Sequence, residues 1–159
     1  MIKVGDKLPE TKFRVMTAEG PAVKSTDDVF KGKKVVLFAV PGAFTPTCHK
    51  NHLPGFVTHA DAIKAKGVDT IAVTGVNDVF VMDAWKKASG GDSIEFLADG
   101  SANFAKALGL TADLTERGLG VRSQRYAMVV DDGVVKTLNV EDAPGKAEVS
   151  GADNLMKSL

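Results

Sequence analysis

The residue best suited to chemistry is Cys48, the only cysteine among the 159 residues of the chain. It follows an apolar run at 35–40 and a polar loop that begins at Pro41, and a helical pattern starts at the cysteine itself. A helix N-terminus has unpaired N–H groups and a partial positive charge, which favour a thiolate over a thiol. The thiolate is the nucleophile, whereas a free cysteine, with a pKa of about 8.5, is only a few per cent ionised at neutral pH. This position predicts a reactive thiol; the alternative is a small buried apolar residue.

The elements that must position this thiol include several β-rich runs. The run at 35–40 is apolar throughout and stops at Pro41-Gly42, as expected of a strand that is buried on both faces. An Asp-Gly pair within 131–133 separates two further runs and predicts a hairpin. The predicted strands are 35–40, 68–76, 94–98, 126–130 and 134–140, and residues 1–30 are expected to contain another hairpin.

Helical patterns lie between these runs. The longest covers 48–66, with apolar residues three or four positions apart, and stops at Gly67. Pro54 lies inside it and predicts a kink or local irregularity. The other predicted helices are 79–88, capped by Asn77 or Asp78, a helix capped by Ser101 that runs through Leu108, and 152–159.

This order of elements predicts an α/β fold. Strand–helix–strand units require parallel strands with right-handed crossovers, and the following hairpin adds antiparallel strands. We therefore expect a single domain, residues 1–159, with a mixed central β-sheet flanked by helices on both faces. A chain of this length is large enough to bury a core.

The loop before Cys48 resembles a known family. Pro41, Thr45 and Cys48 match the Pro-x-x-x-Thr-x-x-Cys motif of peroxiredoxins. The longer stretch Pro-Gly-Ala-Phe-Thr-Pro-Thr-Cys, with His-Leu-Pro-Gly-Phe at 52–56, is similar to the type-five (atypical) subfamily in particular. The resemblance extends over essentially the whole chain, including 76–78, Trp85 and 125–130. It implies a thioredoxin-like fold and a peroxidase that reduces hydrogen peroxide and organic hydroperoxides.

The same resemblance implies a role for each residue of the site. Cys48 would attack one peroxide oxygen and become a sulfenic acid, while its backbone N–H holds the bound oxygen. Thr45 would place its hydroxyl beside the sulfur and the substrate, and Arg125 would stabilise the thiolate and the leaving oxygen. Pro41 would shield the sulfur from water. Cys48, Thr45 and Arg125 are thus expected to bind the substrate as well as to act on it.

These residues also have ordinary structural explanations. Thr45 could serve only as a helix cap, and Pro41 only as the end of a strand. Arg117 and Arg122 are rivals of Arg125, which we prefer because it directly precedes the run at 126–130, where the family has its arginine.

Neither a metal nor an organic cofactor is expected. The chain has no pair of cysteines, and the adjacent Cys48 and His49 cannot easily share one tetrahedral ion.

His52, four residues after Cys48, is interpreted as a packing or hydrogen-bonding residue rather than a catalytic one. His49 and His59 are interpreted as surface residues. The glycines at 118–120 begin like a dinucleotide-binding motif but lack its last glycine and its context.

The chain departs from the two-cysteine pattern of many relatives, because 146–152 contains no second cysteine. We therefore expect a one-cysteine cycle, in which an external thiol condenses with oxidised Cys48 and a second thiol releases it. Glutathione with glutaredoxin is the first expected reductant and thioredoxin the second. The resemblance also implies a homodimer, with Phe44 and Phe80 as candidate contacts, although core packing would explain these residues equally well.

Composition bears on partners and compartment. The 20 Lys and Arg residues balance the 20 Asp and Glu residues, which argues against nucleic acid or a membrane as a partner. No apolar run could cross a bilayer, the first residues lack a signal-peptide pattern, and one free cysteine suits a reducing compartment, so the cytoplasm is expected.

The alternative function is a Cys48-based redox sensor or chaperone-like binding protein. A thiol–disulfide oxidoreductase is disfavoured because its two-cysteine turn is replaced by the residues at 45–48.

Overall fold

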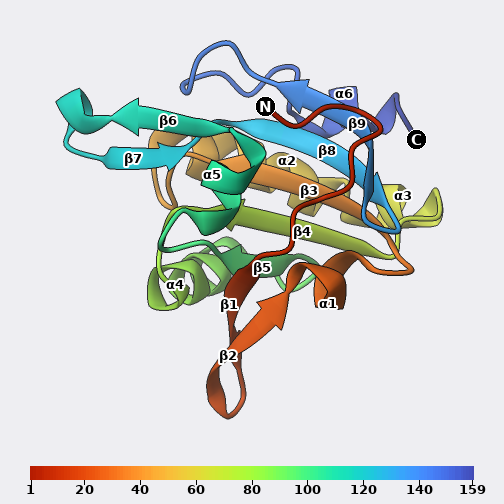
Figure 1. The fold of residues 1–159 in the computed structure, drawn as a ribbon, viewed down its shortest axis with the longest axis horizontal. Helices are drawn as coiled ribbons and strands as arrows, with labels where there is room; N and C mark the ends of the chain where they lie inside the picture. The colour runs from red at the N-terminus through yellow and green to blue at the C-terminus, as the bar shows by residue number, and fades with distance from the viewer.

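The computed structural model describes residues 1–159 and has a seven-stranded sheet at its centre (Figure 1). The bounds of these strands are β1 Lys12–Thr17, β2 Gly20–Ser25, β3 Lys34–Val40, β4 Thr70–Gly75, β5 Glu95–Ala98, β8 Tyr126–Asp131 and β9 Val134–Val140. They lie in the order β2-β1-β5-β4-β3-β8-β9. β3 is parallel to β4 and β4 to β5, and the other neighbours are antiparallel. The predicted mixed sheet and both predicted hairpins are therefore confirmed.

The side chains of β3 alternate between two buried faces of the sheet. On one face, Val36, Phe38 and Val40 share an apolar cluster with residues of four helices: α2 (Leu53–Thr58), α3 (Ala60–Ala65), α4 (Val79–Ser89) and α6 (Ala152–Met156). On the other face, Val35, Leu37 and Ala39 pack with residues of α1 (Thr26–Phe30) and α5 (Asn103–Leu108). Burial on both faces explains why residues 35–40 of β3 are apolar throughout. None of the helices has the length and apolar character that a membrane span requires.

The segment predicted as one helix over 48–66 is divided into three pieces. It begins with a π-helical turn, Cys48–His52, whose last hydrogen bond reaches the carbonyl of Cys48 from the N–H five residues later. α2 follows with Pro54 in its first turn, and a second break at His59 separates α2 from α3. Proline has no N–H to donate to the preceding turn, so the predicted irregularity is confirmed. The break at His59 was not predicted from the apolar spacing.

A second sheet of two strands was also not predicted. β6 (Thr111–Leu114) and β7 (Gly120–Ser123) form an antiparallel hairpin that extends away from the main sheet (Figure 1). A 3-10 turn, Thr115–Arg117, connects them. Most of their side chains are half-buried or exposed, so the hairpin lacks the alternation by which a strand is recognised in sequence.

Two aspartates cap helices on the same edge of the sheet. The Asp78 carboxylate accepts a hydrogen bond from Val81 N–H at the start of α4, which decides between the two predicted caps. The prediction that Ser101 caps α5 is wrong. The carboxylate of Asp99 instead accepts from the N–H groups of the second and third helical residues, at 3.0 Å each. The chain enters α5 through Ala102 with a φ of 61°, and this left-handed residue leaves Ser101 exposed and Asp99 buried against the first turn.

We expect Asp99→Ala to lower the free energy of unfolding by about 1–3 kcal/mol, because two N–H groups of α5 lose their acceptor. Ser101→Ala removes an exposed hydroxyl from the same turn and should change the free energy of unfolding by less than about 0.5 kcal/mol. Urea unfolding of the two variants measures the difference. Equal losses would mean that the serine also caps the helix.

Candidate active site

Cys48 lies beyond the carboxyl end of β3, after the loop formed by residues 41–47. A hydrogen bond of 2.8 Å from Ala43 N–H to Asn77 Oδ1 ties this loop to the segment before α4. Gly42 is packed closely, since a Cβ there would lie 3.1 Å from both Arg122 Nη1 and Thr45 Cγ2. The loop folds back on the first turn of the helix, and the side chain of Cys48 is fully buried.

Two hydrogen-bond donors reach the sulfur of Cys48. Thr45 Oγ1 and Arg125 Nη2 each lie 2.9 Å from Sγ. Thr45 is one helical turn away along the chain, whereas Arg125 directly precedes β8, which pairs with β3 in the sheet. The sulfur is therefore contacted by one charged and one neutral donor, and a charge-assisted bond is the stronger kind. The structure thus brings together three of the four predicted site residues.

The remaining predicted residue and the rival arginines surround this centre. Pro41 is buried at the end of β3, and its carbonyl accepts a hydrogen bond of 3.4 Å from Arg122 Nη1. Arg122 also donates through Nε to Leu119 O at 2.8 Å, so it braces the loop against the β6–β7 hairpin. Arg117 is exposed in the turn of that hairpin. Of the three arginines, Arg125 is the one that donates to the sulfur.

His52 is buried and hydrogen-bonded, as predicted from the sequence. Its Nδ1 lies 2.9 Å from Arg125 Nη1, and its Nε2 lies 2.9 Å from Ser150 O. Burial, helped by the charge of Arg125 and opposed by the bond to Ser150 O, lowers the pKa of His52 from 6.5 to about 3. The ring is therefore neutral at neutral pH, with Nε2–H donating to the carbonyl and Nδ1 accepting from the guanidinium. The four-residue spacing from Cys48 was the only sequence signal for this role.

The guanidinium of Arg125 is held on its other side by the main chain. Its Nε and Nη2 donate to Pro144 O, at 3.1 Å and 3.0 Å. Every residue has a carbonyl oxygen, so no residue type in the sequence could have indicated Pro144 or Ser150 as acceptors.

The other two histidines lie away from the sulfur. His59 is partly exposed and pairs with Asp153, with Nε2 and Oδ1 3.0 Å apart. His49 is half-buried, because its Nδ1 accepts a hydrogen bond of 3.1 Å from Trp85 Nε1 on α4. Both histidines are thus partly exposed, in agreement with their prediction as surface residues. No group of three or more His, Cys, Asp or Glu side chains is arranged to hold a metal ion.

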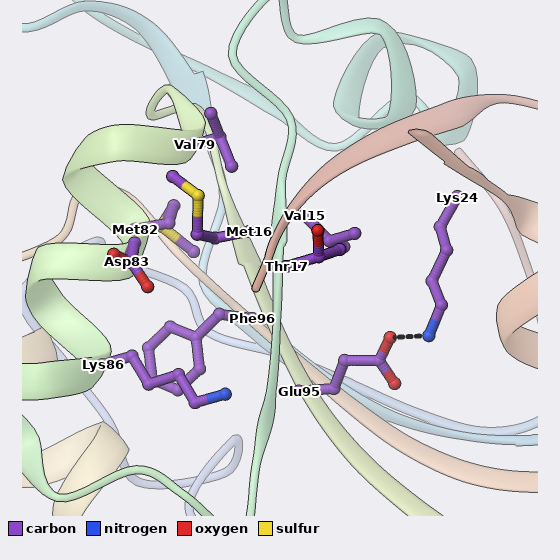
Figure 2. Close-up of a pocket in the computed structure, with 10 residues that line it drawn as sticks. All are labelled: Val15, Met16, Thr17, Lys24, Val79, Met82, Asp83, Lys86, Glu95 and Phe96. Carbon is purple, nitrogen blue, oxygen red and sulfur yellow. Dashed lines mark hydrogen bonds and ion pairs between the residues drawn. The ribbon is translucent and has the colours of Figure 1, made fainter. Parts of the chain in front are cut away.

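A separate hollow of about 300 Å³ lies between β1, α4 and β5 (Figure 2). Met16, Met82 and Phe96 contribute to its lining, and the ion pair of Lys24 with Glu95 lies at one side. None of the predicted site residues lines it. The hollow is therefore distinct from the Cys48 centre.

The neutral state of His52 predicts a loss of stability in acid. Its pKa in the folded chain, about 3, lies below the ordinary value of 6.5, so unfolding takes up a proton between these pH values. The free energy of unfolding should have its full value above about pH 6.5 and should decrease as the pH is lowered toward about 3, by up to about 1.4 kcal/mol per pH unit. Urea unfolding at a series of pH values should give a shallower decline for His52→Gln than for the native chain. His59→Gln, a matched change at a partly exposed histidine, should retain the native slope; an unchanged slope in His52→Gln would contradict the assignment.

Known proteins resemble this chain over nearly its whole length. Residues 3–156 match the family model for Redoxin. The chain is 46% identical to Peroxiredoxin-2C of Oryza sativa subsp. japonica over 160 residues, which are 99% of this chain and 98% of that protein. It is 47% identical to chloroplastic Peroxiredoxin-2E of Arabidopsis thaliana over 163 residues, 99% of this chain and 69% of that protein.

Solved structures extend the comparison to three dimensions. Reduced Prx3 from Vibrio vulnificus in complex with hydrogen peroxide superposes with a TM-score of 0.95 and 54% identity, over 99% of each chain. Peroxiredoxin 5 from Alvinella pompejana gives a TM-score of 0.87 and 34% identity, over 99% of this chain and 97% of that one. These similarities confirm the predicted thioredoxin-like fold. With the Redoxin match, they show that the chain belongs to the peroxiredoxin family, as a type-five member with one cysteine.

Proposed function

We propose that this peroxiredoxin, a thiol-dependent peroxidase, performs its reaction at the sulfur of Cys48 between Thr45 and Arg125. The observation that supports the proposal is that Thr45 Oγ1 and Arg125 Nη2 both lie 2.9 Å from the buried sulfur of Cys48. Preorganised donors stabilise charge there without reorganisation at the moment of reaction.

The reaction begins with in-line attack of the thiolate on the terminal oxygen of a hydroperoxide. An S–O bond forms from a sulfur lone pair while the O–O bond breaks, and the departing oxygen carries away that bond's electrons. This oxygen takes up a proton and leaves as water or an alcohol, while Cys48 becomes a sulfenic acid. Arg125 stabilises the negative charge as it moves from the sulfur to the departing oxygen.

The hydroxyl of Thr45 has one proton to donate, and two possible acceptors lie within reach of it. Its Oγ1 lies 2.7 Å from Gly42 O and 2.9 Å from Cys48 Sγ. Beside a thiol, the hydroxyl donates to the carbonyl and accepts from S–H. Beside the thiolate, it turns and donates to the sulfur. Pro41, buried at the end of β3, is proposed to limit the access of water to this centre.

We propose that an external thiol completes the cycle, since the chain has no second cysteine. The sulfenic acid condenses with this thiol to a mixed disulfide and releases water, and a second thiol then attacks the disulfide and regenerates Cys48. Glutathione with glutaredoxin is the proposed source of these thiols, and thioredoxin is the second candidate.

The remaining proposals concern the whole molecule. A homodimer is proposed through Phe44 and Phe80, which are 46% and 65% exposed. Residues 1–159 are proposed to act as one domain, because one sheet joins strands from both ends of the chain. The cytoplasm is the proposed location, because Cys48 is a free thiol.

Reduced native protein should form a sulfenic acid at Cys48 much faster than free cysteine does, because its thiolate is already stabilised. Stopped-flow mixing with hydrogen peroxide measures the rate, and Cys48→Ser should give no such product. Turnover should be faster with glutathione and glutaredoxin than with thioredoxin. A rate no greater than that of free cysteine would contradict the enzyme, and fast oxidation without turnover by either reductant would favour a redox sensor.

Arg125→Ala should slow the reaction with peroxide by roughly 100-fold or more, because the thiolate and the departing oxygen lose their charged donor. Arg117→Ala, which removes an exposed arginine, should leave the rate unchanged. Second-order rate constants and thermal unfolding are compared for both variants. Similar rate constants in the two would show that the wrong arginine has been assigned.

A further inference from the structure

The groups around the sulfur are oriented by main-chain carbonyls of one loop, residues 141–150. Arg125 donates twice to Pro144 O, and His52 Nε2 donates to Ser150 O at 2.9 Å. Thr47, directly before Cys48, donates from its hydroxyl to Gly145 O at 3.0 Å. The path of this loop therefore decides where the guanidinium and the imidazole point.

Glu141 joins the two ends of the loop. Its N–H donates to Arg125 O at 3.0 Å, which continues the pairing of β8 with β9 by one residue. Its Oε2 accepts from both the N–H and the hydroxyl of Ser150, at 2.7 Å and 2.6 Å. Glu141 and Ser150 are buried, whereas all residues between them are exposed or half-buried. One carboxylate oxygen thus closes the loop.

The Glu141 carboxylate is buried without a cationic partner, since none of the four ion pairs includes it. A carboxylate removed from water is costly unless hydrogen bonds replace its hydration. Two short, charge-assisted bonds from one serine replace it at Oε2. Apolar residues could close a loop without that desolvation cost, so the pair points to a need for a defined loop geometry.

We propose that Glu141 and Ser150 are positioning residues for the peroxidase reaction, an inference that rests on the roles proposed above for Cys48 and Arg125. With Ser150 held by Glu141, its carbonyl orients neutral His52, whose Nδ1 accepts from Arg125. The same closure keeps Pro144 O against the guanidinium, so Nη2 stays at the sulfur. Loss of the two bonds allows the loop to shift and the guanidinium to move with it.

The test compares Glu141→Ala, Ser150→Ala and Glu141→Gln with a matched control, Asp142→Ala. Asp142 is an exposed carboxylate of the same loop that pairs with Lys146. The readouts are the rate constant for Cys48 oxidation by hydrogen peroxide, the ultraviolet absorbance of the Cys48 thiolate at fixed pH, and thermal unfolding.

Glu141→Ala should slow oxidation by roughly 10- to 100-fold and lower the thiolate absorbance, because the guanidinium is misplaced. Ser150→Ala, which keeps one of the two bonds, should have a smaller effect in the same direction. Glu141→Gln should recover part of the rate through its amide oxygen, and the Asp142→Ala control should match the native chain. In an Arg125→Ala background, Glu141→Ala should cause no further slowing.

A folded Glu141→Ala protein with the native rate and thiolate absorbance would overturn the inference, even if its melting temperature were lower. An equal slowing in the presence and absence of Arg125 would also overturn it. If Glu141→Ala does not fold, as judged by circular dichroism, Ser150→Ala decides on the same readouts. Failure of the proposed function would appear in the native chain as slow oxidation, whereas failure of this inference would appear only in the variants.

Discussion

The contact between the sulfur of Cys48 and the guanidinium of Arg125, 2.9 Å apart, is the interaction on which the rest of the site depends. Both residues are buried, so a thiolate here cannot rely on water for solvation. The guanidinium and the Thr45 hydroxyl replace that water. Each of the two charges would be costly to bury alone, and together they compensate one another. The surrounding loops and helices can therefore be understood as the means of keeping this pair together.

The sheet supplies the long-range part of that arrangement. β3 and β8 are antiparallel neighbours, so the end of β3, which leads to Cys48, lies beside the start of β8, which Arg125 precedes. His52 then links the guanidinium to the loop at 141–150, and its burial keeps it neutral. A neutral ring accepts from Arg125, whereas an imidazolium would have no free lone pair and would repel it. The site thus contains one cation facing the sulfur of Cys48.

Several structural features could be predicted because their signals are local. The Asp-Gly pair marks the β8–β9 turn, the apolar run marks β3, and Pro54 marks the irregular start of α2. Where the prediction was wrong, a tertiary effect prevailed. Ser101 has the right residue type for a cap, but the left-handed Ala102 places Asp99 at the first turn of α5 instead. The β6–β7 hairpin has few buried side chains, so it left no apolar period to detect.

The sequence alone determined the proposed nucleophile and the donor that is nearest to it along the chain. Thr45 and Cys48 are three residues apart, and one helical turn brings such residues together whatever the rest of the chain does. The other contacts of the site join distant residues. Arg125 contacts His52 and Cys48, and His52 contacts Ser150, across separations of 73 to 98 residues. Only the strand order and the closure of the loop at 141–150 decided those contacts. Backbone periodicity operates over a few residues, whereas contacts between distant segments depend on how the whole sheet is assembled.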